Sequence, residues 1–264
     1  MKIYLHIDSY LPKNELYDKQ KNMCKLIEAF DNEIVTDITK ADMIFSLGGD
    51  GTFLNSWHKA CDSCCLNTPI FGVNYGTLGY LTEATKQNWQ HKFAKIFENK
   101  YEIENRLILE AYTAGPDTEL PLPVINDVVV RSETCSNFTI TVNDDIIMNY
   151  RGDGVIIATP TGSTGYALSA GGSLVDPSSK IVEIQGLAPH TLANRPVLLE
   201  AKNINDIKIK AEGRQCNTFL VDGQNIERFK EKTIIIRPSE ETMKIVKVDS
   251  NKFEKTIQRV FSSI

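Results

Sequence analysis

The pattern of apolar residues changes near residue 100, and this change restricts the possible folds more than any other feature. Before it, apolar runs alternate with amphipathic stretches. The runs cover residues 2–7, 43–47 and 69–73, and the stretches cover 14–30, 53–64 and 86–99. Strands that alternate with helices indicate a parallel sheet covered by helices. We therefore predict an α/β domain over residues 1–100.

After residue 100 the chain consists of short runs rich in Val, Ile and Thr, separated by turn residues. Residues 122–131 and 137–143 are two such runs, and many of the runs alternate apolar and polar positions. This pattern is typical of a mostly antiparallel β-rich domain, which we place at residues 101–248. Helical spacing returns in the last segment, so we predict a C-terminal helix within 249–264.

Composition excludes several classes of protein. The net charge is −5, whereas nucleic-acid binders are usually basic. No apolar stretch approaches the roughly 18 residues of a membrane helix, and the first residues lack the pattern of a signal peptide. We expect a cytoplasmic protein that binds neither nucleic acid nor membrane.

Six cysteines are present, and Cys61, Cys64 and Cys65 lie close to His58. A zinc site needs a second ligand pair at a recognisable spacing, and none follows. The bland alternative is a set of ordinary thiols, which fits a reducing compartment. We predict no metal site built from protein side chains alone.

Twelve of the sixteen glycines lie in three short segments. Residues 48–51 and 72–79 contain three each, and residues 152–172 contain six. Such clusters indicate tight turns or close approach of backbone to a ligand. The first segment, Gly48-Gly49-Asp50-Gly51-Thr52, follows an apolar run and opens a predicted helix, where N–H groups attract anions. Asp50 is unusual there. It could bind a metal or accept a proton from a hydroxyl, or it could simply cap the helix.

The other two glycine segments add polar groups. Residues 72–81 follow the next predicted strand, at the sheet edge where α/β proteins bind ligands, and Tyr80 could stack on a base or pack in the loop. The third segment, 151–172, is rich in hydroxyls, which are Thr161, Ser163, Thr164 and Ser169. Helix capping needs only one of them, so the surplus favours a polar ligand.

In these segments the chain resembles the bacterial NAD kinase family. The resemblance covers GGDGTFL, NYGTLGYL, Asn126-Asp127, RGDGVIIATPTGSTGYALSAGG, APHTL with the following Arg195-Pro196, and VDGQ, in order from residue 48 to 224. GGDGT alone is shared with lipid kinases, whereas the 22-residue segment is specific. The resemblance implies a homo-oligomer, commonly a tetramer, in which NAD binds between the domains and beside a neighbouring subunit. It also implies that the first domain is Rossmann-like and that the C-terminal helix returns to it.

The resemblance also implies roles for individual residues. Asp50 matches the catalytic aspartate, and Gly48, Gly49, Gly51 and Thr52 form the loop for the phosphate donor. The residues implied to bind NAD are Asp50, Gly51, Tyr80, Asn126, Asp127, Arg151, Asp153, Thr161, Thr164, Gly165, Tyr166, Ser169, Ala188 and Gln224. Tyr80 replaces the Phe of many relatives, and Gly165 replaces their Ala.

The expected reaction is phosphoryl transfer to the 2′-hydroxyl of the adenosine ribose of NAD, which gives NADP. The donor is ATP or polyphosphate. Asp50 would accept the hydroxyl proton, and a divalent cation, expected to be Mg²⁺, would be held by the donor and by water. Two alternatives stay open at this point: a lipid or polyol kinase that shares GGDGT, and a dinucleotide sensor without catalysis.

Overall fold

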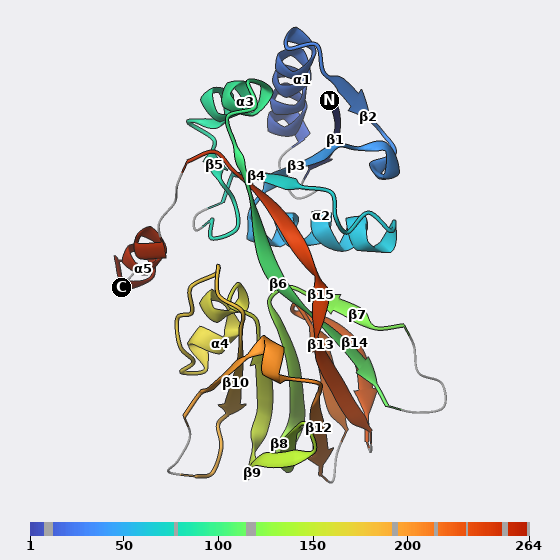
Figure 1. Ribbon diagram of the computed structural model, residues 1–264, viewed down its shortest axis with the longest axis vertical. Helices are drawn as coiled ribbons and strands as arrows, with labels where there is room; N and C mark the ends of the chain where they lie inside the picture. The colour runs from blue at the N-terminus through green and yellow to red at the C-terminus, as the bar shows by residue number, and fades with distance from the viewer. Residues whose placement is uncertain are drawn as a thin grey trace. The chain divides into compact units, whose positions relative to one another are not determined.

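The computed structural model describes residues 1–7, 13–76, 79–114, 120–191, 195–213, 216–230, 232–249 and 253–262, with backbone alone for 13–20, 255, 256, 259 and 262. The chain forms two compact units (Figure 1). One consists of residues 1–105 together with 243–264, and the other of residues 106–242. Two strands, β6 (Glu102–Thr113) and β15 (Thr233–Lys247), run from one unit into the other.

The first unit is a parallel sheet with helices on its faces, as predicted. Its strands are β1 (Lys2–Ile7), β2 (Glu33–Val35), β3 (Met43–Gly48), β4 (Ile70–Asn74) and β5 (Ala84–Thr85). They pair in the order β2-β1-β3-β4, and both β5 and the end of β15 pair in parallel with β4. The helices are α1 (Lys13–Ala29), η1 (Ile38–Lys40), α2 (Asp50–Asp62), α3 (Trp89–Phe97) and α5 (Phe253–Ser262). In Figure 1, α1 and α3 lie above the strands and α2 below them.

Aromatic side chains fill the core of this unit because the strands are apolar on both faces. Phe45 on β3 and Phe93 on α3 are fully buried, with ring centroids 4.5 Å apart. Phe71 on β4 packs against both rings, at 5.5 and 5.4 Å. The core therefore fixes β3 and β4 side by side, and their carboxyl ends carry the first two glycine segments.

The second unit is β-rich, and strands β7 to β14 pair antiparallel within the described residues. Its elements, besides parts of β6 and β15, are β7 (Leu122–Val124), β8 (Asp127–Val142), β9 (Asp145–Ala158), η2 (Gly162–Thr164), α4 (Tyr166–Ser169), β10 (Ile181–Leu187), β11 (Val197–Glu200), η3 (Ala201–Asn203), β12 (Ile207–Glu212), β13 (Asn217–Val221) and β14 (Gln224–Phe229). Strand β8 is central, because it pairs with β9, β12 and β13.

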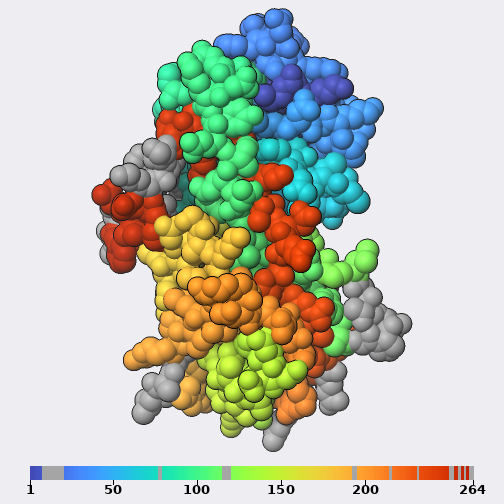
Figure 2. Space-filling view, in the orientation of Figure 1, coloured from blue at the N-terminus to red at the C-terminus, as the bar shows by residue number. Residues whose placement is uncertain are grey.

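Two predicted runs have different boundaries in the structure. The run predicted at 122–131 is interrupted near Asn126, so that it forms β7 and the first part of β8. The run predicted at 137–143 is not a separate strand, because it forms the second part of β8. The β8–β9 hairpin then turns at Asn143 and Asp144, both with positive φ. Hydrogen bonds tie Asn143 to Asn203 and Asn205, and the two segments are neighbours on the face in Figure 2 (yellow-green and orange).

Candidate active site

The first glycine segment lies where β3 ends and α2 begins. A side chain at Gly48 would place its Cβ 2.2 Å from the Thr52 hydroxyl oxygen, so only glycine permits this abrupt turn. Gly49 is the N-cap of α2, and no side chain caps the helix. The first N–H groups of a helix have no acceptor within the helix, and they make this end attractive to anions.

Asp50 occupies the first turn of α2, but its side chain does not cap the helix. Instead its Oδ2 accepts a hydrogen bond from the backbone N–H of Tyr80 (2.8 Å), and its Oδ1 accepts one from the N–H of Leu81 (3.0 Å). The capping alternative is therefore wrong. The carboxylate of Asp50 joins the first glycine segment to the end of the second one.

The second glycine segment bends tightly around Asn74. Gly79 has a φ of +75°, and a Cβ there would lie 2.4 Å from the Asn74 amide nitrogen and 2.8 Å from the Thr82 hydroxyl. The Asn74 side-chain oxygen accepts the N–H of Gly76 at 2.8 Å. Tyr80 is half-buried beyond this bend. Thr77 and Leu78, which belong to the quoted NYGTLGYL motif, lie outside the described residues.

In the second unit, Asn126 and Asp127 form a turn that is clamped by Asp222. The Asp222 carboxylate accepts the backbone N–H groups of Ile125 (3.1 Å), Asn126 (2.7 Å) and Asp127 (3.1 Å). Asp222 and Gly223 have φ values of +47° and +81°, so they form the two-residue turn between β13 and β14. Sequence reasoning did not assign Asp222 a role, although Asp-Gly between two strands is a recognisable hairpin signal.

The Asp127 side chain is buried, with 5% of the residue exposed. Burial raises its pKa to about 7, and the negative charge of Asp222 adds to the rise. The Asn126 side chain is half-buried. The turn therefore offers one amide and one carboxyl group that is easily protonated, a combination that suits recognition of hydroxyls and ring nitrogens.

The third glycine segment packs backbone to backbone against this turn. Thr159 donates its N–H to the Asn126 carbonyl (2.9 Å) and its hydroxyl to the Ile125 carbonyl. A Cβ on Gly162 would lie 2.0 Å from the Asn126 carbonyl oxygen, so the contact requires glycine. At Gly165 an added Cβ would be 3.8 Å from the Asp127 carboxyl, which places the segment beside both predicted residues.

The hydroxyls of this segment divide into two groups. Ser163 is buried and donates to the Pro160 carbonyl, while Thr164 bonds the Thr161 carbonyl and Thr161 accepts a bond from Arg106 at 3.2 Å. These three hydroxyls therefore already bond protein groups. The number of hydroxyls in the segment is thus weaker evidence for a polar ligand than the sequence indicated. Ser169, at the end of α4, is exposed.

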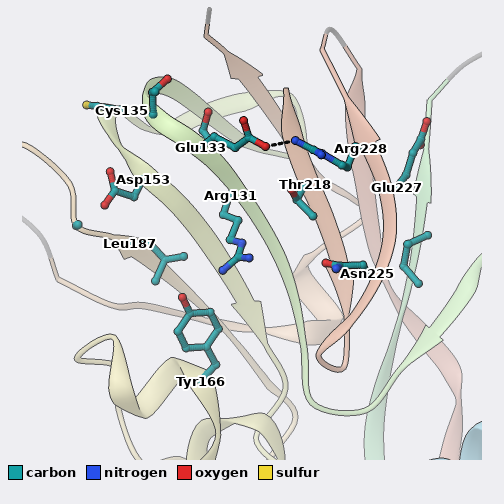
Figure 3. Close-up of a pocket in the computed structure, with 14 residues that line it drawn as sticks. Arg131, Glu133, Cys135, Asp153, Tyr166, Leu187, Thr218, Asn225, Glu227 and Arg228 are labelled. Atoms are coloured by element: carbon teal, nitrogen blue, oxygen red, sulfur yellow. Dashed lines mark hydrogen bonds and ion pairs between the residues drawn. The ribbon is translucent and has the colours of Figure 1, made fainter. Parts of the chain in front are cut away.

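A pocket of about 810 Å³ opens in the second unit (Figure 3). Three predicted residues line it, namely Asp153, Tyr166 and Ala188. Sequence reasoning missed its other polar residues, which include Arg131, Thr218, Asn225 and the ion pair of Glu133 with Arg228. In Figure 3 the Arg131 side chain and the Tyr166 ring point toward each other across the pocket. Tyr166 is 44% exposed, so much of this residue is accessible.

Arg151 and Gln224 are among the predicted residues that do not line this pocket. Arg151 shares strand β9 with Asp153, but it lines a neighbouring pocket of about 740 Å³ together with Asn137 and Glu212. Gln224 begins β14 directly after the Asp222-Gly223 turn and is exposed. Leu192, within the quoted stretch before Arg195, lies outside the described residues.

A glycine-rich loop at a helix N-terminus, together with a polar pocket, is typical of an enzyme that binds phosphorylated ligands. The chain matches the ATP-NAD kinase N-terminal domain over residues 8–101 and the ATP-NAD kinase C-terminal domain over residues 126–248. The chain therefore belongs to the ATP-NAD kinase family, and it is a kinase.

Individual relatives agree with this assignment. An NAD kinase of Lachnoclostridium phytofermentans is 36% identical over 225 residues, covering 81% of this chain and 78% of that protein. An NAD kinase of Clostridium perfringens is 31% identical over 262 residues, covering 97% and 90%. Among solved structures, an Archaeoglobus fulgidus NAD kinase in complex with ATP has a TM-score of 0.79 and 26% identity, covering 99% of both chains. Yeast NADH kinase with NADH has a TM-score of 0.83 at 20% identity and covers 99% of this chain and 87% of its own, which shows the shared fold.

Proposed function

We propose that this enzyme transfers the terminal phosphoryl group of ATP to the 2′-hydroxyl of the adenosine ribose of NAD. The 2′-oxygen forms the new bond to phosphorus, the bond from phosphorus to the ADP oxygen breaks, and NADP and ADP are released. The observation that carries the proposal is the Asp50 carboxylate, held by the N–H groups of Tyr80 and Leu81 at a helix end that attracts anions.

Asp50 is the proposed acceptor of the hydroxyl proton. Each of its oxygens accepts one backbone hydrogen bond, and a carboxylate oxygen can accept a second. The two N–H groups orient the carboxylate without using all of its lone pairs. Gly48, Gly49, Gly51 and Thr52 are proposed to approach the donor phosphates, because a loop with so little side-chain bulk leaves the backbone accessible.

The second unit is proposed to bind NAD. Asn126 and Asp127 would hold the ribose and adenine edge, supported by the three bonds from Asp222 that fix their backbone. Tyr166, Asp153 and Ala188 would contact the dinucleotide in the 810 Å³ pocket that they line. Further proposed NAD contacts are Gly51, Tyr80, Arg151, Thr161, Thr164, Gly165, Ser169 and Gln224.

A divalent cation, Mg²⁺ in this proposal, fits the donor set around Asp50. The described residues contain no group of three or more His, Cys, Asp or Glu side chains that could hold a metal, and Mg²⁺ commonly binds through one carboxylate, substrate phosphates and water. With Asp50 as the proposed proton acceptor, the donor phosphates and water are the proposed ligands of the cation. The cation would neutralise charge on the phosphoryl oxygens.

The proposal includes a homo-oligomer in the cytoplasm, with a tetramer as the expected form. Within the described residues, none of the helices reaches the length and apolar character that crossing a membrane requires. Light scattering on the active enzyme tests the oligomer directly. A fully active particle of the monomer mass, 29.6 kDa, would contradict it.

A coupled assay tests the reaction itself. NADP formation from NAD is measured once with ATP and once with polyphosphate as the donor. Phosphorylation of diacylglycerol by ATP is measured in parallel. We expect turnover with NAD and ATP and none with diacylglycerol. Turnover of diacylglycerol alone would favour a lipid kinase. NAD binding without NADP formation from either donor would contradict the proposed reaction.

A further inference from the structure

Tyr80 and Leu81 donate the two N–H groups that bind Asp50, and the buried Glu83 follows two residues after Leu81. The Glu83 side chain has no exposed area. Its own N–H bonds the Gly72 carbonyl on β4 at 3.0 Å, so this position is fixed both by its backbone and by its side chain.

One oxygen of Glu83 collects three donors. Its Oε1 accepts hydrogen bonds from the Lys92 ammonium group (2.8 Å) and from the backbone N–H groups of Val248 (3.2 Å) and Asp249 (3.0 Å). Its Oε2 forms an ion pair with Lys247 at 3.5 Å. The carboxylate therefore joins the loop after Tyr80 to α3 and to the residues at the end of β15.

Lys92 connects the Glu83 carboxylate to a second ion pair nearer the surface, between Asp249 and Lys95. Its ammonium group also bonds the Glu83 carbonyl oxygen (2.6 Å) and pairs with the Asp249 carboxylate (3.2 Å). Asp249 in turn pairs with Lys95 at 3.0 Å, and this last pair is partly exposed. Buried charges are retained at a net cost unless they are paired and hydrogen-bonded, and Glu83 satisfies both conditions.

Only Leu81 and Thr82 lie between Tyr80, whose N–H binds Asp50, and Glu83. Residues span at most about 3.6 Å each, so a shift of Glu83 must be absorbed by Leu81 and Thr82 alone. Both of these are buried. On the other side, Gly79 is packed against Asn74 and Thr82 with no room for a Cβ. A displacement at Glu83 is therefore transmitted to the two N–H groups that orient Asp50.

We propose that Glu83 is a positioning residue for phosphoryl transfer. It acts through the N–H groups of Tyr80 and Leu81 on the orientation of the Asp50 carboxylate. The inference rests on the proposed function of Asp50 as proton acceptor. It assigns to Glu83, and to Lys92 and Lys247 around it, a contribution to kcat rather than to substrate affinity.

The test is Glu83→Gln, which keeps an acceptor for Val248 and Asp249 but removes the charge that binds Lys92 and Lys247. We expect kcat to fall about tenfold or more, because small displacements of reacting groups are costly, with KM for NAD and ATP within about twofold. Lys95→Ala is the matched control, since it breaks only the outer pair with Asp249. We expect its kcat to equal that of the wild type.

Combination with Asp50→Asn separates positioning from general damage. If Glu83 acts through Asp50, Glu83→Gln causes no further loss of the residual kcat in the Asp50→Asn enzyme. An equal loss in both backgrounds, or an unchanged kcat in Glu83→Gln alone, would overturn the inference. If Asp50→Asn itself keeps full activity, the proposed role of Asp50 has failed instead, which is a different result.

Thermal unfolding shows whether Glu83→Gln is folded at the assay temperature. If it is not, Lys247→Met replaces it, because this variant removes the 3.5 Å ion pair with Glu83 and leaves Lys92 in place. A smaller fall in kcat with unchanged KM, again absent in the Asp50→Asn background, is then expected. An unchanged kcat in a folded Lys247→Met enzyme would count against the inference.

Discussion

Asp222 accepts a hydrogen bond from the backbone N–H of Asp127, while its negative charge opposes ionisation of the Asp127 side chain. The same carboxylate thus builds the turn and changes the acidity of the residue in it. Burial of Asp127 has the larger effect, and together they raise its pKa from 3.8 to about 7. This residue is proposed to contact NAD, so its protonation is relevant to stability and to binding.

Stability should fall as pH rises through the range from about 4 to 7. In that range folded Asp127 holds a proton that the unfolded chain has released, so raising the pH favours unfolding. A shift of this size corresponds to at most about 4 kcal/mol. Asp127→Asn should remove this dependence and unfold at a higher temperature than wild type at pH 8, with little difference at pH 4.

Asp222→Asn provides the control for this prediction, because an amide oxygen still accepts backbone N–H groups and Asn tolerates the positive φ. Removing the charge should shift the stability change of wild-type Asp127 to lower pH without abolishing it. Identical pH dependence of unfolding in wild type and Asp127→Asn would show that Asp127 is ionised normally in the folded protein.

Asp50→Asn should lower kcat by about 10²–10⁴-fold, the usual contribution of a positioned general base. The amide can accept only one of the two N–H groups that Asp50 binds, so a modest loss of stability is expected as well. Calorimetry should show that NAD binding changes much less than kcat. If kcat stays within a few fold at saturating magnesium and ATP, Asp50 holds the loop in place but is not the base.

Asn126→Ala should raise the dissociation constant for NAD at least tenfold, about 1.4 kcal/mol. The backbone of residue 126 is held by Asp222 and Thr159, so the turn should survive removal of the side chain. Asn149→Ala on β9, an exposed position, is the control. Unchanged NAD affinity in a folded Asn126→Ala protein, measured by titration calorimetry, would exclude this contact.

Gly162→Ala should lower the free energy of unfolding much more than Gly165→Ala. Gly162→Ala places a Cβ 2.0 Å from a backbone oxygen that cannot move alone, so we expect a loss of about 1–3 kcal/mol in unfolding free energy. For Gly165→Ala the nearest atom is 3.2 Å away, and the expected loss is below about 1 kcal/mol. Urea unfolding of both variants measures the difference, and similar losses would contradict the prediction.

The sequence predicted the elements with strong periodicity and missed contacts between distant segments. The apolar run before Gly48 and the stripe through Phe93 indicated a buried strand and an amphipathic helix, and both are present. No local pattern indicates that Asp50 bonds residues 30 positions away, or that Asp222 bonds Asn126 across 96 positions. Arg131 ends an apolar strand run, and the pairing of β8 with β9 and β13 places it at the pocket beside Asp153 and Thr218.

The order of synthesis limits how the first unit can be completed. This unit is discontinuous, since the strand segment that pairs with β4 through Ile245 belongs to residues 243–264. A chain growing on a ribosome presents its N-terminal part first, but β4 must wait for this partner until residue 245 has been made. Unit 106–242 is continuous, and the strands β6 and β12 within it receive their partner β15 once residues 233–242 are made. A chain truncated before residue 243 should therefore keep a folded β-rich unit while its N-terminal unit stays open to proteases.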